Sequence, residues 1–201
     1  MMNAGEFDCR IQILQLADMG GNAFEWRVKK NAWAKKEQVA ANSMFSKYGI
    51  TARSVKFTIH NDPDLSLHNA IAKAPPGTGH YFITDINRET PGYNILSTAF
   101  IWPSKCTVTR TKTLTDDKNR PVIEKLPPLI FPGYLTEKYL KQEQQEPMSY
   151  SEGRFVLVTP KVIEIQTGEL ITIGGAEYEM VIPHVLDPYK NEYEILRRAD
   201  N

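Results

Sequence analysis

The sequence predicts a mainly β protein that consists of two tandem small β-barrel domains with long loops and little helix. Three observations lead to this expectation. Landmark residues of the first half return in the second, many short runs are rich in β-branched and aromatic residues, and turn-forming residues separate these runs. The expected domains are residues 1–105 and 106–201, with the boundary between residues 102 and 112.

The repeat consists of landmark pairs that keep their order along the two halves. Their offsets lie between 97 and 100 residues, and residues 31–38 fall against residues 130–139. Because the order is kept throughout, we expect two copies of one domain, although sequence identity between the halves is low. The pairs are Cys9 with Cys106, Phe57 with Phe155, Tyr81 with Tyr178, Tyr93 with Tyr193, and Leu96 with Leu196.

Strand-like segments follow one another along the first half. Residues 10–16 alternate between polar and apolar side chains, which is the period of a half-buried strand. Gly20-Gly21-Asn22 then marks a hairpin turn. Three further runs are rich in β-branched and aromatic residues, and they are residues 54–60, 80–86 and 93–101.

The second half carries the same kind of signals. Asp116-Asp117-Lys118-Asn119 marks a turn at the place of the first hairpin turn. Residues 162–182 predict three short strands, separated by Thr167-Gly168-Glu169 and Gly174-Gly175. Helix is expected at most in residues 63–74 and in residues 135–146, and the latter could equally be a polar strand followed by a loop.

Composition narrows the class of protein. The formal net charge is zero, from 24 basic and 24 acidic residues, which argues against a protein that grips nucleic acid along one basic face. Residues 1–109 carry 12 Lys and Arg against 9 Asp and Glu, and residues 110–201 carry 12 against 15. No apolar run is long enough to span a membrane, and no secretory signal is visible at the start. Two cysteines fit a reducing compartment.

Residues 74–79, Ala-Pro-Pro-Gly-Thr-Gly, resemble an ATPase phosphate loop without its lysine. Such a loop needs glycine first, a lysine followed by Ser or Thr at the end, and a helix after it. Here Ala74 stands at the first position, and His80 and Tyr81 stand at the last two. The stretch is therefore expected to be a turn that leads into a strand, with no bound nucleotide.

Catalytic and metal-binding patterns are absent from the sequence. The four histidines form no His-x-x-x-His pair, the cysteines form no Cys-x-x-Cys pair, and no Gly-x-Ser-x-Gly elbow occurs. His60 beside Asp62 and Asp64 is the nearest approach to a polar cluster, and a strand end with a capped turn explains it better. We therefore expect no enzyme, no cofactor and no metal.

Two long loops occupy the same place in the two repeats, residues 38–54 and 141–153. One interpretation is that each is an ordinary hairpin tip. The other is that each is a contact surface that becomes ordered on assembly. The candidate contact residues are Met44, Phe45, Lys47, Tyr48 and Arg53 in the first loop, and Met148, Ser149 and Tyr150 in the second.

Residues 3–102 carry a recognisable order of segments. A strand "GEFDCRIQIL" leads to Asp18-Met19-Gly20-Gly21, then to Trp26 and to the pair Trp33-Ala34, and later to the strands "VKFTI" and "Y-x-I". This order resembles the head–tail joining proteins of tailed bacteriophages, also called head-closure or stopper proteins. The second half departs from the pattern, because it reads Pro132-Gly133-Tyr134 where the first has Trp33-Ala34.

The resemblance implies a small β-barrel with a long loop and a structural role in the virion. Members of this family form a homo-oligomeric ring in the phage neck, of twelve or alternatively six subunits, between the portal or adaptor ring and the tail terminator or tail proteins. Double-stranded DNA passes through the ring without specific contacts, and channel loops help to retain or gate it. By this resemblance residues 38–54 are the channel loop, and Lys47 and Arg53 are its positive charges.

Further implications are assembly in the host cytoplasm, a final place in the virion neck, and no membrane partner. The main alternative is a tail-completion or tail-terminator component that binds the tail tube. A β-barrel adaptor unrelated to phage and an enzyme are the remaining alternatives.

Overall fold

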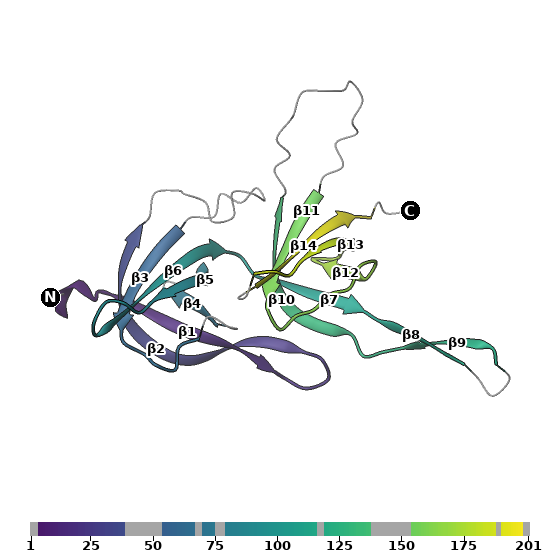
Figure 1. Cartoon of the computed structure of the whole chain (residues 1–201), viewed down its shortest axis with the longest axis horizontal. Coiled ribbons are helices and arrows are strands. Elements are labelled where there is room, and N and C mark those ends of the chain that lie inside the picture. The colour runs from purple at the N-terminus through teal and green to yellow at the C-terminus, as the bar shows by residue number, and fades with distance from the viewer. Residues whose placement is uncertain are drawn as a thin grey trace, which may run out of the picture.

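The computed structural model describes residues 4–38, 54–66, 70–74, 79–115, 119–137, 154–187 and 190–198. These residues form two closed six-stranded antiparallel barrels and a two-stranded arm, after a short 3-10 helix at Ala4–Glu6 (Figure 1). The first barrel contains β1 (Cys9–Asp18), β2 (Phe24–Gln38), β3 (Ser54–His60), β4 (Ala70–Ala74), β5 (Gly79–Asn87) and β6 (Tyr93–Ile101). The second contains β7 (Ser104–Thr109), β10 (Leu129–Glu137), β11 (Arg154–Pro160), β12 (Leu170–Ile173), β13 (Ala176–His184) and β14 (Lys190–Arg197), and the arm is β8 (Thr111–Thr115) with β9 (Pro121–Lys125).

The two barrels share one topology. The strand order is β1-β2-β3-β6-β5-β4 in the first and β7-β10-β11-β14-β13-β12 in the second, so each strand of one has a counterpart in the other. Tyr81 lies on β5 and Tyr178 on its counterpart β13. Each tyrosine is followed three residues later by a β-bulge, at Thr84 and at Val181. The mainly β architecture of two tandem barrels predicted from the sequence is therefore confirmed.

The ladder registers correct some of the landmark pairs. Counted from the two bulges, Leu96 on β6 corresponds to Tyr193 on β14, because each pairs with the residue that lies two positions after the bulge. Leu96 pairs with Phe57, and Tyr193 pairs with Leu157. Phe57 therefore corresponds to Leu157 and not to Phe155, and all four of these paired side chains are fully buried. The predicted correspondences of Phe57 with Phe155, Tyr93 with Tyr193 and Leu96 with Leu196 are wrong by two or three residues.

A similar shift separates the two cysteines. Ile13 pairs with Ala72, which pairs with Tyr81, and Val108 pairs with Ile171, which pairs with Tyr178. Val108 thus corresponds to Ile13, and Cys106 corresponds to Ile11 rather than to Cys9. By the same registers Gly133 takes the place of Ala34, so Pro132-Gly133 replaces Trp33-Ala34 as the sequence indicated.

Each barrel has its own hydrophobic core, and a third cluster joins the barrels. The interior of the first includes Ile11, Phe57 and Leu96, and that of the second includes Phe131 and Ile171. The joining cluster combines residues from both barrels, and its buried members are Leu14, Phe82, Ala99, Tyr134, Val156 and Val158. The rings of Phe82 and Tyr134 meet edge to face with their centroids 5.6 Å apart. The two barrels therefore pack against each other through a largely apolar contact.

The predicted helix at residues 63–74 is wrong. Residues 70–74 are strand β4, which pairs with both β1 and β5 and closes the barrel. For residues 135–146 the sequence left a helix and a polar strand followed by a loop as equal alternatives, and the described residues are strand, because β10 continues to Glu137. In both places the local helix propensity of Ala, Leu and Lys loses to pairing between strands.

The three strands predicted in residues 162–182 are reduced to two, β12 and β13. Residues 163–166 form a loop whose Ile163 and Ile165 are buried in the second core. Side chains of β14 replace a ladder partner for this loop: the Tyr193 hydroxyl donates to the Ile163 carbonyl at 2.9 Å and accepts from the Ile165 amide at 3.2 Å. Buried backbone groups are thus satisfied without a strand.

The predicted turns are confirmed where the structure describes them, and residues 75–78 and 116–118 lie outside the described residues. Gly20, Gly21 and Asn22 all have positive φ, at 81°, 64° and 63°, between β1 and β2. Asn119 has φ 60° before β9, and Gly168 has φ 85° before β12. Positive φ is the conformation for which glycine and asparagine are the usual choices, so these turns are readable from the sequence.

Candidate assembly surfaces

The contact residues predicted in the long loops lie outside the described residues. Residues 38–54 join β2 to β3, and residues 141–153 lie within the connection from β10 to β11, so the two connections are topologically equivalent. The strand ends that carry them lie on one side of the two barrels, uppermost in Figure 1.

The stretch that resembles a phosphate loop connects two strands. β4 ends at Ala74 and β5 begins at Gly79, so no helix follows that could present its N-terminal amides to a phosphate. The described part of this connection therefore has the strand-to-strand arrangement expected from the sequence.

The residues around His60 form a capped strand end. Asp62 is largely buried, forms an ion pair with Lys30 and accepts a hydrogen bond from the Asp64 amide at 3.2 Å. The His60 ring stacks on Phe7 with the centroids 4.7 Å apart. These contacts fix a turn between β3 and the following loop, as the sequence suggested.

Among the described residues, no group of three His, Cys, Asp or Glu side chains is placed to hold a metal ion. Burial raises the pKa of the Cys106 thiol to about 12, and burial also raises the pKa of Cys9. Both thiols are therefore held in the protonated form, which is the poorer nucleophile.

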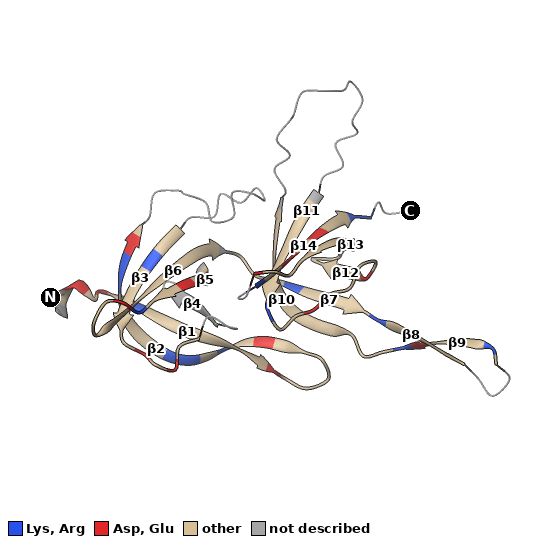
Figure 2. Ribbon diagram, in the orientation of Figure 1, with Lys and Arg blue, Asp and Glu red and all other residues tan. Residues whose placement is uncertain are grey.

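Figure 2 shows basic and acidic segments interspersed along both barrels in the part of the chain that is described. Within those same residues, no helix has the length and apolar character needed to cross a bilayer.

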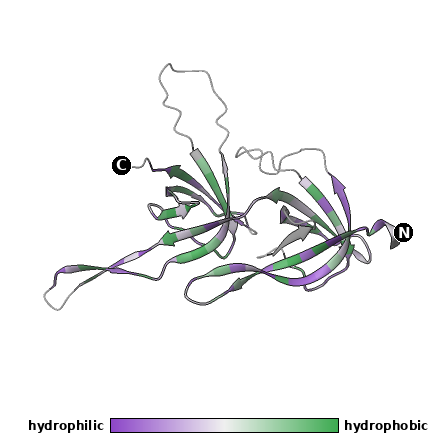
Figure 3. Ribbon diagram, turned by 180° about the vertical axis from the view of Figure 1, so that it is seen from behind, coloured by the Kyte–Doolittle hydropathy of each residue, from purple (hydrophilic) through white to green (hydrophobic). Residues whose placement is uncertain are grey.

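The hairpin formed by β1 and β2 reaches beyond the first barrel and packs on the second. Leu16 is 9% exposed and belongs to the core cluster of the second barrel, and Phe24 and Trp26 pack against that cluster. In Figure 3, hydrophobic segments continue from the barrels into this hairpin. We call this distal hairpin, residues 14–28, the clamp, because it attaches the first barrel to the second.

Backbone pairing fixes the tip of this clamp. The Ile130 amide donates to the Asn22 carbonyl at 2.9 Å, and Ala23 forms an isolated parallel bridge with Ile130. This pairing is open to Ile130 because β11 pairs with β10 only from Tyr134 onward. A groove at the contact is lined by residues of the hairpin and of β7 and β10, among them Phe24, Trp26, Ser104, Lys105, Phe131 and Pro132.

The arm is the counterpart of this clamp in the second barrel. Counted from the tips, five residues from Leu14 to Asp18 match five from Thr111 to Thr115, and each is followed by a five-residue tip that contains Asn22 or Asn119 in the fourth place. Between these residues and its barrel, the arm has two more residues on each strand than the first hairpin has. After the tips, Phe24–Val28 matches Pro121–Lys125.

In contrast to the clamp, the arm is exposed on both faces. Every residue of β8 and β9 is exposed, including Ile123 at 70% and Val122 at 47%. Figure 1 shows the arm extending away from both barrels. A two-stranded ribbon is marginally stable on its own in water, so an exposed ribbon with apolar side chains is a candidate contact surface.

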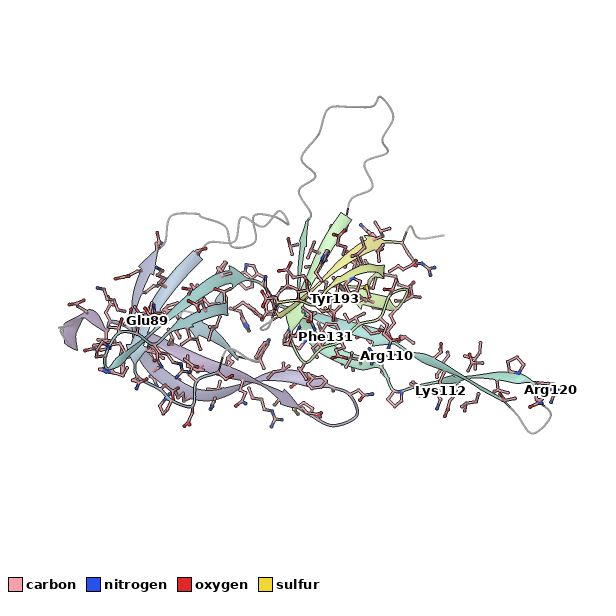
Figure 4. All side chains as sticks on the ribbon, in the orientation of Figure 1. Glu89, Arg110, Lys112, Arg120, Phe131 and Tyr193 are labelled. Atoms are coloured by element: carbon pink, nitrogen blue, oxygen red, sulfur yellow. The ribbon has the colours of Figure 1, made fainter. Side chains whose placement is uncertain are left out.

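Arg110 anchors the base of the arm. Its guanidinium donates to both carboxylate oxygens of Glu169, at 2.6 and 3.2 Å, and to the Glu164 carbonyl at 2.6 Å. The Arg110 carbonyl accepts from the Leu126 amide at 3.0 Å, which closes the hairpin beneath β8 and β9. Figure 4 shows Arg110 where the arm leaves the second barrel and Arg120 near its tip. The contacts of the Arg110 guanidinium with Glu169 and Glu164 fix the direction in which the arm leaves the barrel.

The arm was missed by sequence reasoning beyond its turn. The signal available was the alternation in Thr111–Thr115, followed by the turn residues and by the run Pro121-Val122-Ile123. The exposure of that run could not be read from the sequence, because the matching run in the first half is covered.

Searches against protein-family models, curated proteins and solved structures find no match to this chain.

Proposed function

We propose that this chain is a structural protein of the bacteriophage neck. It forms a homo-oligomeric ring that joins the DNA-filled head, on its portal or adaptor side, to the tail terminator or tail proteins. It is assembled in the host cytoplasm and ends in the virion, where it helps to retain or gate double-stranded DNA. The chain acts through its surfaces and not through catalysis.

The observation that carries the proposal is the fusion of two barrels of the same topology, each with a long hairpin and an equivalent long connection between counterpart strands. One hairpin packs on the neighbouring barrel within the chain, and its counterpart is exposed. Repeating barrels that hold one another by hairpins are suited to a ring, in which many modest contacts act together. Interspersed charges suit a conduit through which DNA must slide without being held.

Disruption of the gene in the phage that carries it tests the proposal. The expected result is DNA-filled heads without tails, or heads that lose their DNA, and restoration of infectivity by the wild-type chain supplied in trans. Tails of abnormal length with normally closed heads would instead indicate the tail-terminator alternative. Normal infectious yield without the gene, or virions that lack the chain by mass spectrometry, would overturn the neck assignment.

Deletion of residues 42–50 tests the DNA-retaining role of the first loop separately. We expect both barrels to remain folded, because β2 and β3 keep their pairing partners. In the phage, the deletion is expected to give heads that leak DNA or fail to join tails. Infectious particles at normal yield would contradict a channel role for Met44, Phe45, Lys47 and Tyr48, the four candidate residues that the deletion removes.

A further inference from the structure

We propose that the β8–β9 arm docks on the first barrel of a second copy of this chain, at the strip formed by residues 8–10 and 31–33. The proposal deepens the proposed function, because it names the donor and the acceptor of the contact between subunits. The clamp is a hairpin of the same kind as the arm, and within the chain it is covered by the second barrel.

The registers locate the matching acceptor on the first barrel. Ile130, which receives the clamp, pairs with Thr107 on β7, and the corresponding pair in the first barrel is Asn31 with Gln12 on β1. Like Ile130, Asn31 lies on a part of the strand that precedes the pairing with the next strand, since β3 pairs with β2 only from Ala34. The edge position that the clamp uses on the second barrel therefore recurs on the first.

The surface around this position also corresponds. The groove under the clamp is lined by Ser104 and Lys105, and their counterparts Cys9 and Arg10 line a groove on the first barrel together with Asp8 and Lys36. Trp33 stands where the second barrel has Pro132 and is 58% exposed. An exposed indole beside an open groove provides an apolar platform for the side chain that stands in the place of Trp26, which is Ile123.

The acceptor site that is already filled within the chain determines which barrel the arm can bind. The acceptor on the second barrel is already filled by the chain's own clamp, so the arm of another copy cannot use it. The arm cannot reach the first barrel of its own chain either, because it leaves the second barrel in the opposite direction (Figure 1). The open acceptor that remains is on a second copy.

The contact is therefore heterologous. Each copy offers one arm and one acceptor strip, and head-to-tail contacts of this kind close into a ring or continue as a filament. In such an assembly every barrel receives one hairpin, alternately from its own chain and from the neighbouring chain.

A complementation experiment with the full-length chain tests the direction of the contact. Ile123→Asp disables the arm and Trp33→Asp disables the acceptor, and both side chains are exposed in the single chain, so folding is expected to be preserved and is checked by thermal melting. In sedimentation velocity, each variant alone is expected to assemble at least tenfold more weakly than wild type. An equimolar mixture is expected to form heterodimers that grow no further. Leu186→Asp, at a side chain that is 99% exposed, is the matched control and is expected to assemble normally.

Cross-linking tests the site. A Cys9→Ser, Pro121→Cys chain is mixed with a Cys9→Ser, Arg10→Cys chain and treated with a short bis-maleimide, because Arg10 is exposed and pairs with Trp33 in the strip, whereas Cys9 packs against the first core. The expected product joins residue 121 of one chain to residue 10 of the other, whereas Cys106 is fully buried and Leu186→Cys in place of Pro121→Cys is expected to give no such product. A wild-type chain that remains monomeric at all concentrations, or a ring that forms equally well with Ile123→Asp, would overturn the proposal. The latter result would leave the neck assignment standing, and absence of the chain from virions would leave the arm contact standing.

Discussion

Leu16 and Thr113 stand at the same rung of two equivalent hairpins, yet Leu16 is buried against the second barrel and Thr113 is exposed. Leu16 lies opposite Trp26, and Thr113 lies opposite Ile123. One of the two equivalent hairpins therefore makes its contact within the chain, and the other makes none with the rest of the described chain beyond its base. The buried side chain of Leu16 is matched by the exposed side chain of Thr113.

Leu16→Ala tests the clamp. Removal of a largely buried leucine is expected to lower the free energy of unfolding by about 2 to 4 kcal/mol, because the cavity in the second core cannot fully collapse. Thr113→Ala is the matched control and is expected to change it by less than about 0.5 kcal/mol. Urea unfolding followed by circular dichroism measures both. Equal effects of the two substitutions would mean that the clamp adds nothing to stability.

Gly133→Ala tests the close approach inside the second barrel. A Cβ at this position would lie 2.7 Å from the Cys106 sulfur and 2.8 Å from a Leu157 methyl carbon, so both side chains must shift. We expect a loss of about 1 to 3 kcal/mol of stability. Gly5→Ala, where no atom lies within 4 Å, is expected to be neutral. Adding Cys106→Ala to Gly133→Ala is expected to recover part of the loss, and strict additivity of the two changes would contradict the packing argument.

Alkaline pH is expected to destabilise the protein through Cys106. Burial raises the pKa of its thiol from 9.0 to about 12, so the unfolded chain loses this proton before the folded chain does. Its contribution to stability is complete below pH 9 and falls between pH 9 and about 12, by about 1.4 kcal/mol at pH 10. Burial raises the pKa values of Tyr134 and Tyr193 as well, which adds a loss of the same sign above pH 10.

Chemical unfolding at pH 8, 9 and 10 measures this loss. The Cys106→Ala variant is expected to be less stable at pH 8 but to decline less steeply up to pH 10. Parallel pH profiles for wild type and variant would exclude the thiol as the cause.

Arg110→Lys tests the anchor of the arm. Lysine keeps the charge but cannot make the paired contacts to Glu169, so we expect faster hydrogen exchange in β8 and β9 and a loss of stability of about 1 kcal/mol or less, since the pair is partly exposed. Arg198→Lys, whose contact with Glu179 spans 3.5 Å between exposed side chains, is the control and is expected to leave exchange in the arm unchanged. Unchanged exchange in both variants would show that Arg110 does not hold the arm.

Turns and barrel strands were largely predictable from the sequence, because glycine and asparagine at positive φ and alternating side chains are local signals. Gly20 and Asn119 illustrate the first, and Ile11 and Ile13, which are buried on either side of the less buried Gln12, illustrate the second. β4 was not predictable, since Ala70–Ala74 has no strand propensity of its own and is held by β1 and β5 on either side.

The register of the strands and the exposure of their side chains also could not be predicted from the sequence. A side-chain period of two allows a landmark such as Phe155 to be matched to Phe57, when the ladder aligns Leu157 instead. The surface role of the arm was hidden because a run such as Pro121-Val122-Ile123 has the composition of a buried strand. Only the comparison with the covered clamp distinguishes the two.

Cryo-electron microscopy of the neck in virions that contain this chain tests the account most directly. We expect a closed ring at the junction of head and tail, in which each β8–β9 arm lies on the first barrel of the neighbouring subunit with Ile123 against Trp33. A neck without this chain, or a ring in which the arms point into solvent and residues 31–33 are uncovered, would contradict it.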